Sequence, residues 1–85
     1  MRRLVLEQRY IVTLHADDEM NADDLAVCDL ERIVLTGEII ERQRDAMMSE
    51  YKYRVRGRDL GGSAAEVVAK VSSTGKVVFI TVYSL

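Results

Sequence analysis

The sequence of 85 residues contains no proline, no tryptophan, one cysteine and one histidine. The single cysteine, Cys28, excludes an intrachain disulfide, and the single histidine, His15, excludes a zinc site built from several histidine or cysteine ligands. The longest strongly apolar run, residues 77–83, is far shorter than the roughly 20 residues that a membrane-spanning helix needs. We therefore expect a cytoplasmic protein that binds no metal or other cofactor and does not contact a membrane.

Hydrophobic residues make up 48% of the chain and charged residues 31%, which excludes a disordered or collagen-like protein. A chain of this length forms one domain, residues 1–85, with little room for a deep enclosed pocket. The net charge of −2 conceals an asymmetry. Residues 1–38 carry nine acidic and four basic side chains, whereas residues 39–85 carry eight basic and five acidic ones. The second half therefore leaves room for a basic face.

Two segments of the first half are expected to be helical at least in part. Residues 25–36 place apolar side chains at helical spacing and are followed by Gly37, a typical helix stop. In residues 9–14, β-branched side chains favour a short strand, followed by a helical turn around residues 15–21. Leu4, Ile11 and Leu14 also fit a helix that begins at residue 2. We favour the strand, and both interpretations of residues 2–14 stay open.

After residue 37 the hydrophobic period changes to two, which is typical of strands. Four strands are expected, at residues 38–42, 51–58, 64–72 and 76–83. Turns are expected between them, at residues 46–49, 59–63 and 73–75. Because short connections join antiparallel neighbours, the fold class is α+β, with N-terminal helices packed on an antiparallel sheet of about four strands.

The last of these strands alternates two sets of side chains. Val78, Ile80 and Val82 form the set that we expect to face the core. Thr81 and Tyr83 then point to the other face, where the Tyr83 hydroxyl can donate a hydrogen bond and its ring can stack on a nucleic-acid base. Ordinary packing at the end of the sheet is the alternative for Tyr83.

The strand at residues 51–58 carries a basic stripe, which consists of Lys52, Arg54, Arg56 and Arg58. Period-two spacing puts these cations within about 20 Å on one face of the strand. They repel one another, and the regularly spaced phosphates of a nucleic acid relieve that repulsion. The alternative is an ordinary charged sheet face, where Glu66 and Lys70 of the next strand share the stripe's side and can balance part of it.

His15 is the natural proton-transfer group near neutral pH. Glu19 follows four residues later and can pair with His15 if both lie on one helical turn. The alternative for His15 is a hydrogen-bonded structural histidine. Around Glu19 lies an acidic cluster, which consists of Asp17, Asp18, Glu19, Asp23 and Asp24. It lacks the alternating pattern of a calcium-binding loop, so we interpret it as a solvated helix face.

Four motifs follow one another along the chain: Y-I-V-T-L-H-A-D-D-E-M at residues 10–20, a segment at 30–40 that ends in T-G-E-I-I, K-Y-x-x-x-G at 52–57, and F-I-T-V-Y at 79–83. With this set the chain resembles a family of small bacterial proteins of unassigned function, whose members have T-x-H-A near the start and T-V-Y at the end. The subgroup with H-A-x-x-E-M is the nearest, and the resemblance covers nearly the whole chain. Members are often encoded beside YgiT-type zinc-finger proteins that look like antitoxins.

That family is similar to the RelE and MqsR messenger-RNA interferase toxins. The resemblance implies a RelE-like fold and a metal-independent ribonuclease that acts on messenger RNA as the toxin of a type II toxin–antitoxin pair. The implied catalytic residues are His15, Glu19, Lys52 and Tyr83. The expected RNA-binding residues are Thr81 and the basic stripe, including Lys52. The implied partners are RNA and a YgiT-type zinc-finger antitoxin, and a homodimer is an open alternative to a monomer.

The chain departs from the wider family at two positions. Much of that family has arginine where this sequence has Glu19 and Asp23. If those arginines take part in cleavage, a second hypothesis follows, in which the chain is a protein-interaction or RNA-binding module without catalysis.

Overall fold

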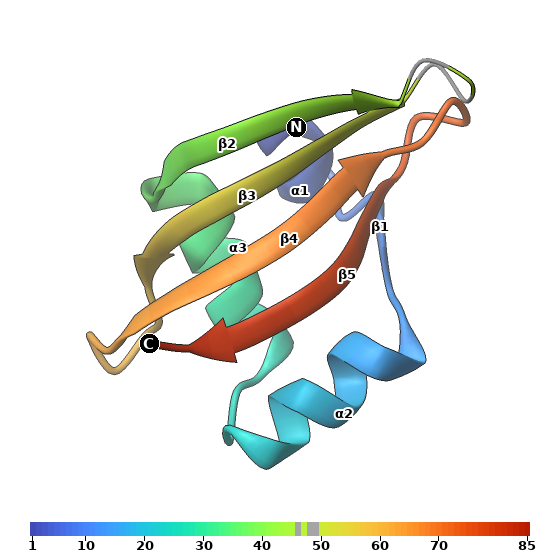
Figure 1. Cartoon of the computed structure of the whole chain (residues 1–85). Helices are drawn as coiled ribbons and strands as arrows, with labels where there is room; N and C mark the ends of the chain where they lie inside the picture. The colour runs from blue at the N-terminus through green and yellow to red at the C-terminus, as the bar shows by residue number, and fades with distance from the viewer. Residues whose placement is uncertain (46, 48–49) are drawn as a thin grey trace.

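The computed structural model describes residues 1–45, 47 and 50–85, and in this part of the chain three helices accompany a sheet (Figure 1). The helices are α1 (Arg2–Leu6), α2 (Leu14–Ala22) and α3 (Val27–Thr36). The strands are β1 (Tyr10–Val12), β2 (Glu38–Asp45), β3 (Glu50–Arg58), β4 (Ala64–Val71) and β5 (Val77–Ser84). The α+β class expected from the sequence is confirmed.

The strands form a sheet in the order β1-β5-β4-β3-β2. The strands from β2 to β5 are antiparallel neighbours, as expected from their short connections. β1 adds a fifth strand that runs parallel to β5, so the sheet is mixed. The turn expected at residues 46–49 falls on positions 46, 48 and 49, which lie outside the described residues.

The ambiguous N-terminal segment contains a helix and a strand in succession. α1 ends at Leu6, the chain passes through Gln8 with a φ of 58°, and β1 begins at Tyr10. The Tyr10 ring meets the Phe79 ring edge-on, with the two centroids 5.4 Å apart, and this contact ties β1 to the core. The short strand is confirmed, and the alternative helix is confined to residues 2–6.

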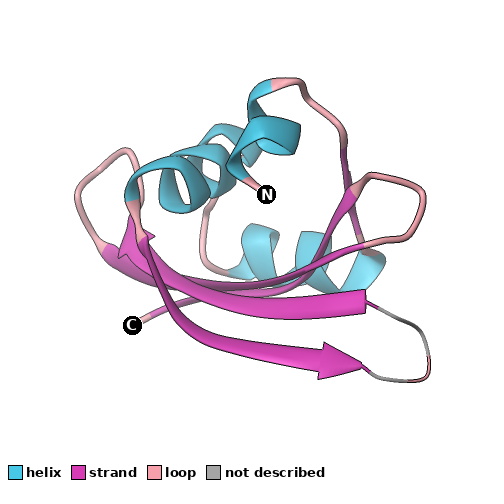
Figure 2. Cartoon of the chain, turned by 90° about the horizontal axis from the view of Figure 1, so that it is seen from above, coloured by secondary structure: helices cyan, strands magenta, loops and turns pink. Residues whose placement is uncertain are grey.

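α3 packs on the sheet through an apolar side that buries Leu30, Ile33 and Val34. α1 packs against α3, so these two helices cover one face of the sheet (Figure 2). α2 contacts β5 and lies beyond the edge of the sheet that β1 and β5 form. Among the described residues, the face opposite α1 and α3 is free of helices. None of the three described helices has the length and hydrophobicity that a membrane-spanning helix requires.

Each end of α3 has a specific cause. The Asp29 carboxylate accepts a hydrogen bond from the Ala26 N–H at 2.8 Å, and the helix begins at residue 27 rather than at the expected 25. The helix ends before Gly37, as expected, but Gly37 has an extended backbone instead of the left-handed conformation of a typical stop. Glycine is needed here for space, because a Cβ would lie 2.4 Å from the Ile33 carbonyl oxygen and 2.6 Å from that of Arg56.

β5 faces the core with a different set of side chains from the expected one. Val77, Phe79 and Val82 are fully buried, whereas Val78 and Ile80 are only half-buried. The register between β4 and β5 shifts at residue 80, where β5 carries one extra residue. Such a bulge reverses the alternation of side chains beyond it. The prediction for Val82 is confirmed, and those for Val78 and Ile80 are wrong.

Candidate functional site

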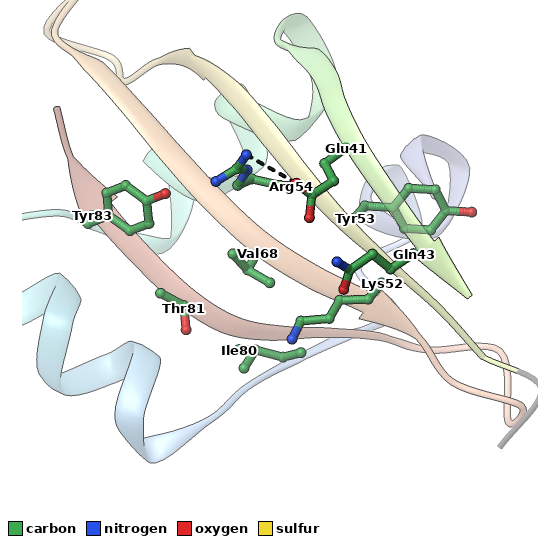
Figure 3. A pocket seen from close by; sticks show the side chains of 9 residues that line it. All are labelled: Glu41, Gln43, Lys52, Tyr53, Arg54, Val68, Ile80, Thr81 and Tyr83. Carbon is green, nitrogen blue, oxygen red and sulfur yellow. Dashed lines mark hydrogen bonds and ion pairs between the residues drawn. The ribbon is translucent and has the colours of Figure 1, made fainter. Parts of the chain in front are cut away.

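The helix-free face of the sheet carries an open pocket of about 340 Å³ (Figure 3). Residues from β2, β3, β4 and β5 line it: Glu41, Gln43, Lys52, Tyr53, Arg54, Val68, Ile80, Thr81 and Tyr83. Polar side chains of β2 and β3 lie on one side of Val68, and those of β5 lie on the other. The Tyr53 ring points away from this group and packs against the core.

Two local features bring the polar side chains to this face. Alternation along β3 places Lys52 and Arg54 here, because Tyr53 between them and Val55 after them face the core. On β5, the bulge at Ile80 turns Thr81 and Tyr83 to the same face. The pocket therefore unites side chains of two strands that are not neighbours, across the width of β4.

Beside the pocket, β4 holds a buried carboxylate. Glu66 is 2% exposed and accepts hydrogen bonds from Arg56 Nε at 2.9 Å, Arg56 Nη2 at 2.7 Å and the Tyr83 hydroxyl at 2.7 Å. The hydrogen bonds from Tyr83 and Arg56 lower the pKa of Glu66, so this group is ionised at neutral pH. The same hydrogen bond, together with burial, raises the pKa of Tyr83, so the phenol keeps its proton.

The cations of the basic stripe differ in what balances their charge. Arg56 is paired with Glu66 at 2.7 Å. Arg54 lies 3.6 Å from Glu66 through its Nε and donates from Nη2 to Glu41 at 3.2 Å. Lys52 forms no ion pair with any residue that the structure describes, and its side chain extends across the pocket toward β5 (Figure 3). The expectation that Glu66 balances part of the stripe is confirmed for Arg54 and Arg56. Lys70 does not contribute to this balance, because it is itself a cation and pairs with Glu50 at 3.6 Å. Among the described residues, Lys52 and Arg58 have no counter-ion, and of these two only Lys52 lines the pocket.

Thr13 fastens the start of α2 to β5. Its hydroxyl accepts a hydrogen bond from the Ala16 N–H at 3.1 Å, which caps the helix, and donates to the Ile80 carbonyl at 3.3 Å. Its backbone N–H donates to the Phe79 carbonyl at 3.2 Å, and Ala16 is fully buried. The threonine and alanine of the T-x-H-A motif therefore have structural roles, because they fix where α2 begins relative to β5.

Two carboxylates of the α2 region accept hydrogen bonds from the backbone of β5. Glu19 Oε1 accepts from the Val82 N–H at 3.2 Å and Asp23 Oδ2 accepts from the Ser84 N–H at 3.1 Å, beyond the point where β1 stops pairing. His15 Nε2 lies 3.3 Å from the same Glu19 oxygen, so the expected pair is present, and 69% of the His15 side chain is exposed. The acidic cluster is therefore only in part a solvated face, since two of its members hydrogen-bond the sheet edge.

The predicted site residues fall into three groups. The pocket brings together four of them: Lys52, Arg54, Thr81 and Tyr83. Arg56 lies further along the same face, where the buried carboxylate holds it, and Arg58 donates to a carbonyl of the β3–β4 turn at 2.8 Å. His15 and Glu19 lie on α2 at the β5 edge and do not line the pocket.

Sequence reasoning missed three polar residues of this face as site members: Glu41, Gln43 and Glu66. Glu66 has a detectable signal, since it is a single charge inside the apolar run A-A-E-V-V-A, and a buried charge requires partners. Glu41 and Gln43 have no such signal, because residues 41–45 are all polar and the sequence does not distinguish the two faces of this strand.

The pocket offers an ammonium, a guanidinium, a hydroxyl and a phenol ring on an open surface. This combination suits an anion that also has flat rings, such as a single nucleic-acid strand. Among residues 1–45, 47 and 50–85, no three His, Cys, Asp or Glu side chains are placed to hold a metal ion.

Comparison with known proteins gives one match. The model of a family described as a domain of unknown function (DUF4258) matches residues 12–84, which span both the α2 motif and the end of β5. No curated protein and no solved structure matches the chain. A family of unassigned function was expected and is confirmed at that level, whereas the likeness to interferase toxins and the antitoxin partner stay predictions.

Proposed function

Since the chain belongs to the DUF4258 family, whose function is unassigned, we propose its function from the site itself: a metal-independent endoribonuclease that acts on messenger RNA as the toxin of a toxin–antitoxin pair. The observation that carries this proposal is the pocket in which Lys52, Arg54, Thr81 and Tyr83 meet. These four residues were selected from the sequence for phosphate contact or chemistry, and they line one cavity.

RNA fits this pocket by charge and by shape. Lys52 is a cation without a protein counter-ion in the described part of the chain, so a phosphate can pair with it at no loss of an existing ion pair. Arg54 shares the pocket and offers further N–H donors in a planar arrangement that matches a phosphate. The Tyr83 ring, held by its hydrogen bond to Glu66, provides a rigid wall against which a base can stack.

Cleavage proceeds by attack of the RNA 2′-oxygen on the adjacent phosphorus. This forms a 2′,3′-cyclic phosphate and breaks the bond to the 5′-oxygen, so one group accepts the 2′-hydroxyl proton and another protonates the departing oxygen. We assign the first role to His15. Among the groups that can share the work, Glu19 already accepts a backbone hydrogen bond and the Tyr83 hydroxyl already donates a hydrogen bond to Glu66, whereas the Lys52 ammonium is uncommitted. We therefore assign the second role to Lys52, with Arg54 stabilising the charge on phosphorus.

The test uses the purified full chain with free messenger RNA in the presence of EDTA, and with messenger RNA on intact ribosomes in magnesium buffer. We expect fragments that end in a 2′,3′-cyclic phosphate. His15→Ala should slow cleavage at least about 100-fold, which is the lower range for loss of a general acid or base. Lys52→Gln should slow it similarly. Lys76→Gln is the matched control, because Lys76 is an exposed lysine of the β4–β5 turn outside the pocket.

Intact RNA in both settings contradicts the proposal, and so does a Lys52→Gln variant that cleaves as fast as Lys76→Gln. A cellular test addresses the toxin role separately. Induced expression should arrest growth, and co-expression of the proposed YgiT-type zinc-finger partner should restore it. The wild-type chain and His15→Ala are compared at equal protein levels. If the wild-type chain does not slow growth under these conditions, the toxin role is contradicted.

A second candidate function is RNA binding without catalysis. It is favoured by the position of His15, which does not line the pocket, and by the use of Glu19 as an acceptor for β5. In this case RNA binds and stays intact. On a single strand the log–log slope of affinity against salt is roughly −0.7 per phosphate contact, so Lys52→Gln should make the slope shallower by about that amount. Binding with that slope change and no cleavage favours this candidate over the ribonuclease.

A further inference from the structure

The β2–β3 hairpin carries a second group of cations on the face opposite the pocket. In the β2–β3 register, Arg42 pairs with Tyr53 and Arg44 pairs with Tyr51. Directly opposed residues of an antiparallel pair point to the same side of the sheet, so these four side chains form one array. We name it the arginine–tyrosine array. It lies on the side away from Lys52, because Lys52 alternates with its two tyrosines along β3.

The array is organised by contacts between its members. The Arg42 guanidinium carbon lies 5.1 Å from the centroid of the Tyr51 ring, which is a cation–π contact. The Tyr51 and Tyr53 rings are 6.3 Å apart at a tilt of 33°. Tyr53 is half-buried against the core, whereas Tyr51, Arg42 and Arg44 are exposed. Tyr53 thus anchors the array, and the other three present a ring and two guanidinium groups to solvent.

The charges of the array are not balanced within the described part of the chain. Neither Arg42 nor Arg44 forms an ion pair with a residue whose side chain the structure describes, whereas Arg54 and Arg56 on the pocket side share Glu41 and Glu66. Two unbalanced cations separated by one residue attract a ligand with more than one negative charge.

We propose that the arginine–tyrosine array binds single-stranded RNA, with a base stacked at Tyr51 and phosphates held by Arg42 and Arg44. The hairpin is narrow, and its edge strand β2 separates the array from the pocket, so one RNA strand that occupies the pocket can continue around β2 to the array. An acidic peptide fits less well, because it pairs with the arginines and leaves the exposed Tyr51 ring unused, whereas every base offers a flat face for stacking. The choice of RNA as ligand rests on the proposed function, but the array itself needs no catalysis.

The experiment measures anisotropy of a labelled single-stranded RNA of 12 nucleotides with the full chain at several salt concentrations. For the double variant Arg42→Gln, Arg44→Gln, we expect weaker binding and a log–log salt slope shallower by about 1.4, which is two contacts of roughly 0.7 each. Tyr51→Ala should weaken binding roughly fivefold to hundredfold with an unchanged slope, because a lost stack carries no charge. Tyr51→Phe keeps the ring and should bind as wild type does. Arg32→Gln, at an exposed position on α3, is the matched arginine control.

The outcomes separate this inference from the proposed ribonuclease. If wild type binds RNA and Lys52→Gln weakens it, but the double arginine variant binds like Arg32→Gln, the array is refuted while the pocket stands. If the array variants lose affinity and no RNA is ever cleaved, the ribonuclease fails and the array is supported. A peptide of 12 glutamates serves as a competitor at the same concentration as the RNA. If it displaces RNA equally well from wild type and from Tyr51→Ala, RNA is refuted as the preferred ligand of the array. No measurable RNA binding by wild type overturns both.

Discussion

Replacing Glu66 by glutamine removes the charge at the centre of the hydrogen-bond network and keeps the shape of the side chain. The wild-type carboxylate receives three donors, two from Arg56 and one from Tyr83, while 98% of Glu66 is shielded from water. A glutamine amide has one acceptor oxygen and an NH₂ group. With its oxygen toward Arg56, its NH₂ group faces the Tyr83 hydroxyl, which must then change from donor to acceptor. The hydrogen bonds that remain lose their charge assistance, and Arg56 loses its counter-ion.

The magnitude follows from the exposure of the partners. Hydrogen bonds to charged groups contribute about 1.5–3 kcal/mol and neutral ones about 0.5–1.5 kcal/mol. The Arg56 side chain is 56% exposed, so water takes over part of its interaction and the lower end of the range applies. We expect Glu66→Gln to lower the free energy of unfolding by about 1–3 kcal/mol at pH 7, and the melting temperature by roughly 5–15 °C for a domain of this size.

The stabilisation that Glu66 provides depends on pH. The pKa of Glu66 is lower in the folded chain than in the unfolded one, so the stabilisation is present above the unfolded value of about 4.3 and disappears as the pH falls through the folded value. Thermal melts followed by circular dichroism should therefore show a larger difference between wild type and Glu66→Gln at pH 7 than at pH 3. Glu41→Gln is the control, because Glu41 is an exposed carboxylate on the same face, paired with Arg54 at 3.2 Å, and should cost under about 1 kcal/mol. Equal melting temperatures for wild type and Glu66→Gln at pH 7, or a loss that is the same at pH 3, would refute this account of the network.

Three further predictions concern the surroundings of the site. Tyr83→Phe should change how stability depends on pH in the alkaline range. Because the pKa of Tyr83 is raised in the folded chain, its stabilisation of the fold is complete below about pH 10 and is lost as the pH rises through the folded value. The melting temperatures at pH 9 and pH 11 should therefore differ more for wild type than for the variant. Glu19→Ala should cost about 1 kcal/mol in urea denaturation, because a β5 backbone N–H loses its acceptor, whereas Asp18→Ala on the exposed side of α2 should be neutral; equal costs for the two would contradict the edge-capping role. Gly37→Ala should lower the free energy of unfolding by roughly 2 kcal/mol or more, since a Cβ there meets backbone carbonyl oxygens of α3 and β3, while Gly61→Ala, with only a side-chain atom at 3.4 Å, should be tolerated; equal midpoints in chemical denaturation for the two variants would show that the close approach of α3 to β3 is unimportant.

The alternation of residues along single strands was sufficient to predict the basic stripe. Lys52, Arg54 and Arg56 lie on one face of β3, and Val55 is buried on the other, because a strand has a period of two whatever surrounds it. The helix ending before Gly37 and the i,i+4 pair of His15 with Glu19 are predictable for the same reason, since both depend on the local geometry of a helix.

Tertiary pairing decided what the sequence could not show. The alternation along β5 predicts Thr81 and Tyr83 on the face away from the core, where they lie, but it also predicts Ile80 in the core, which is wrong. The side chain positions beyond residue 80 depend on a bulge, which exists only because β5 has one residue more than β4 over that stretch of the ladder.

The roles of the acidic side chains also depended on distant neighbours. Glu19 and Asp23 belong to a cluster that fits a solvated helix surface, yet they accept hydrogen bonds from backbone groups 61–63 residues away. Glu66 meets Arg56 and Tyr83 at separations of 10 and 17 residues. Local sequence periodicity specifies which way a side chain leaves its own element, but whether a charge is solvated or buried is set by the elements packed against it, because burial and hydrogen-bond partners are properties of the assembled sheet.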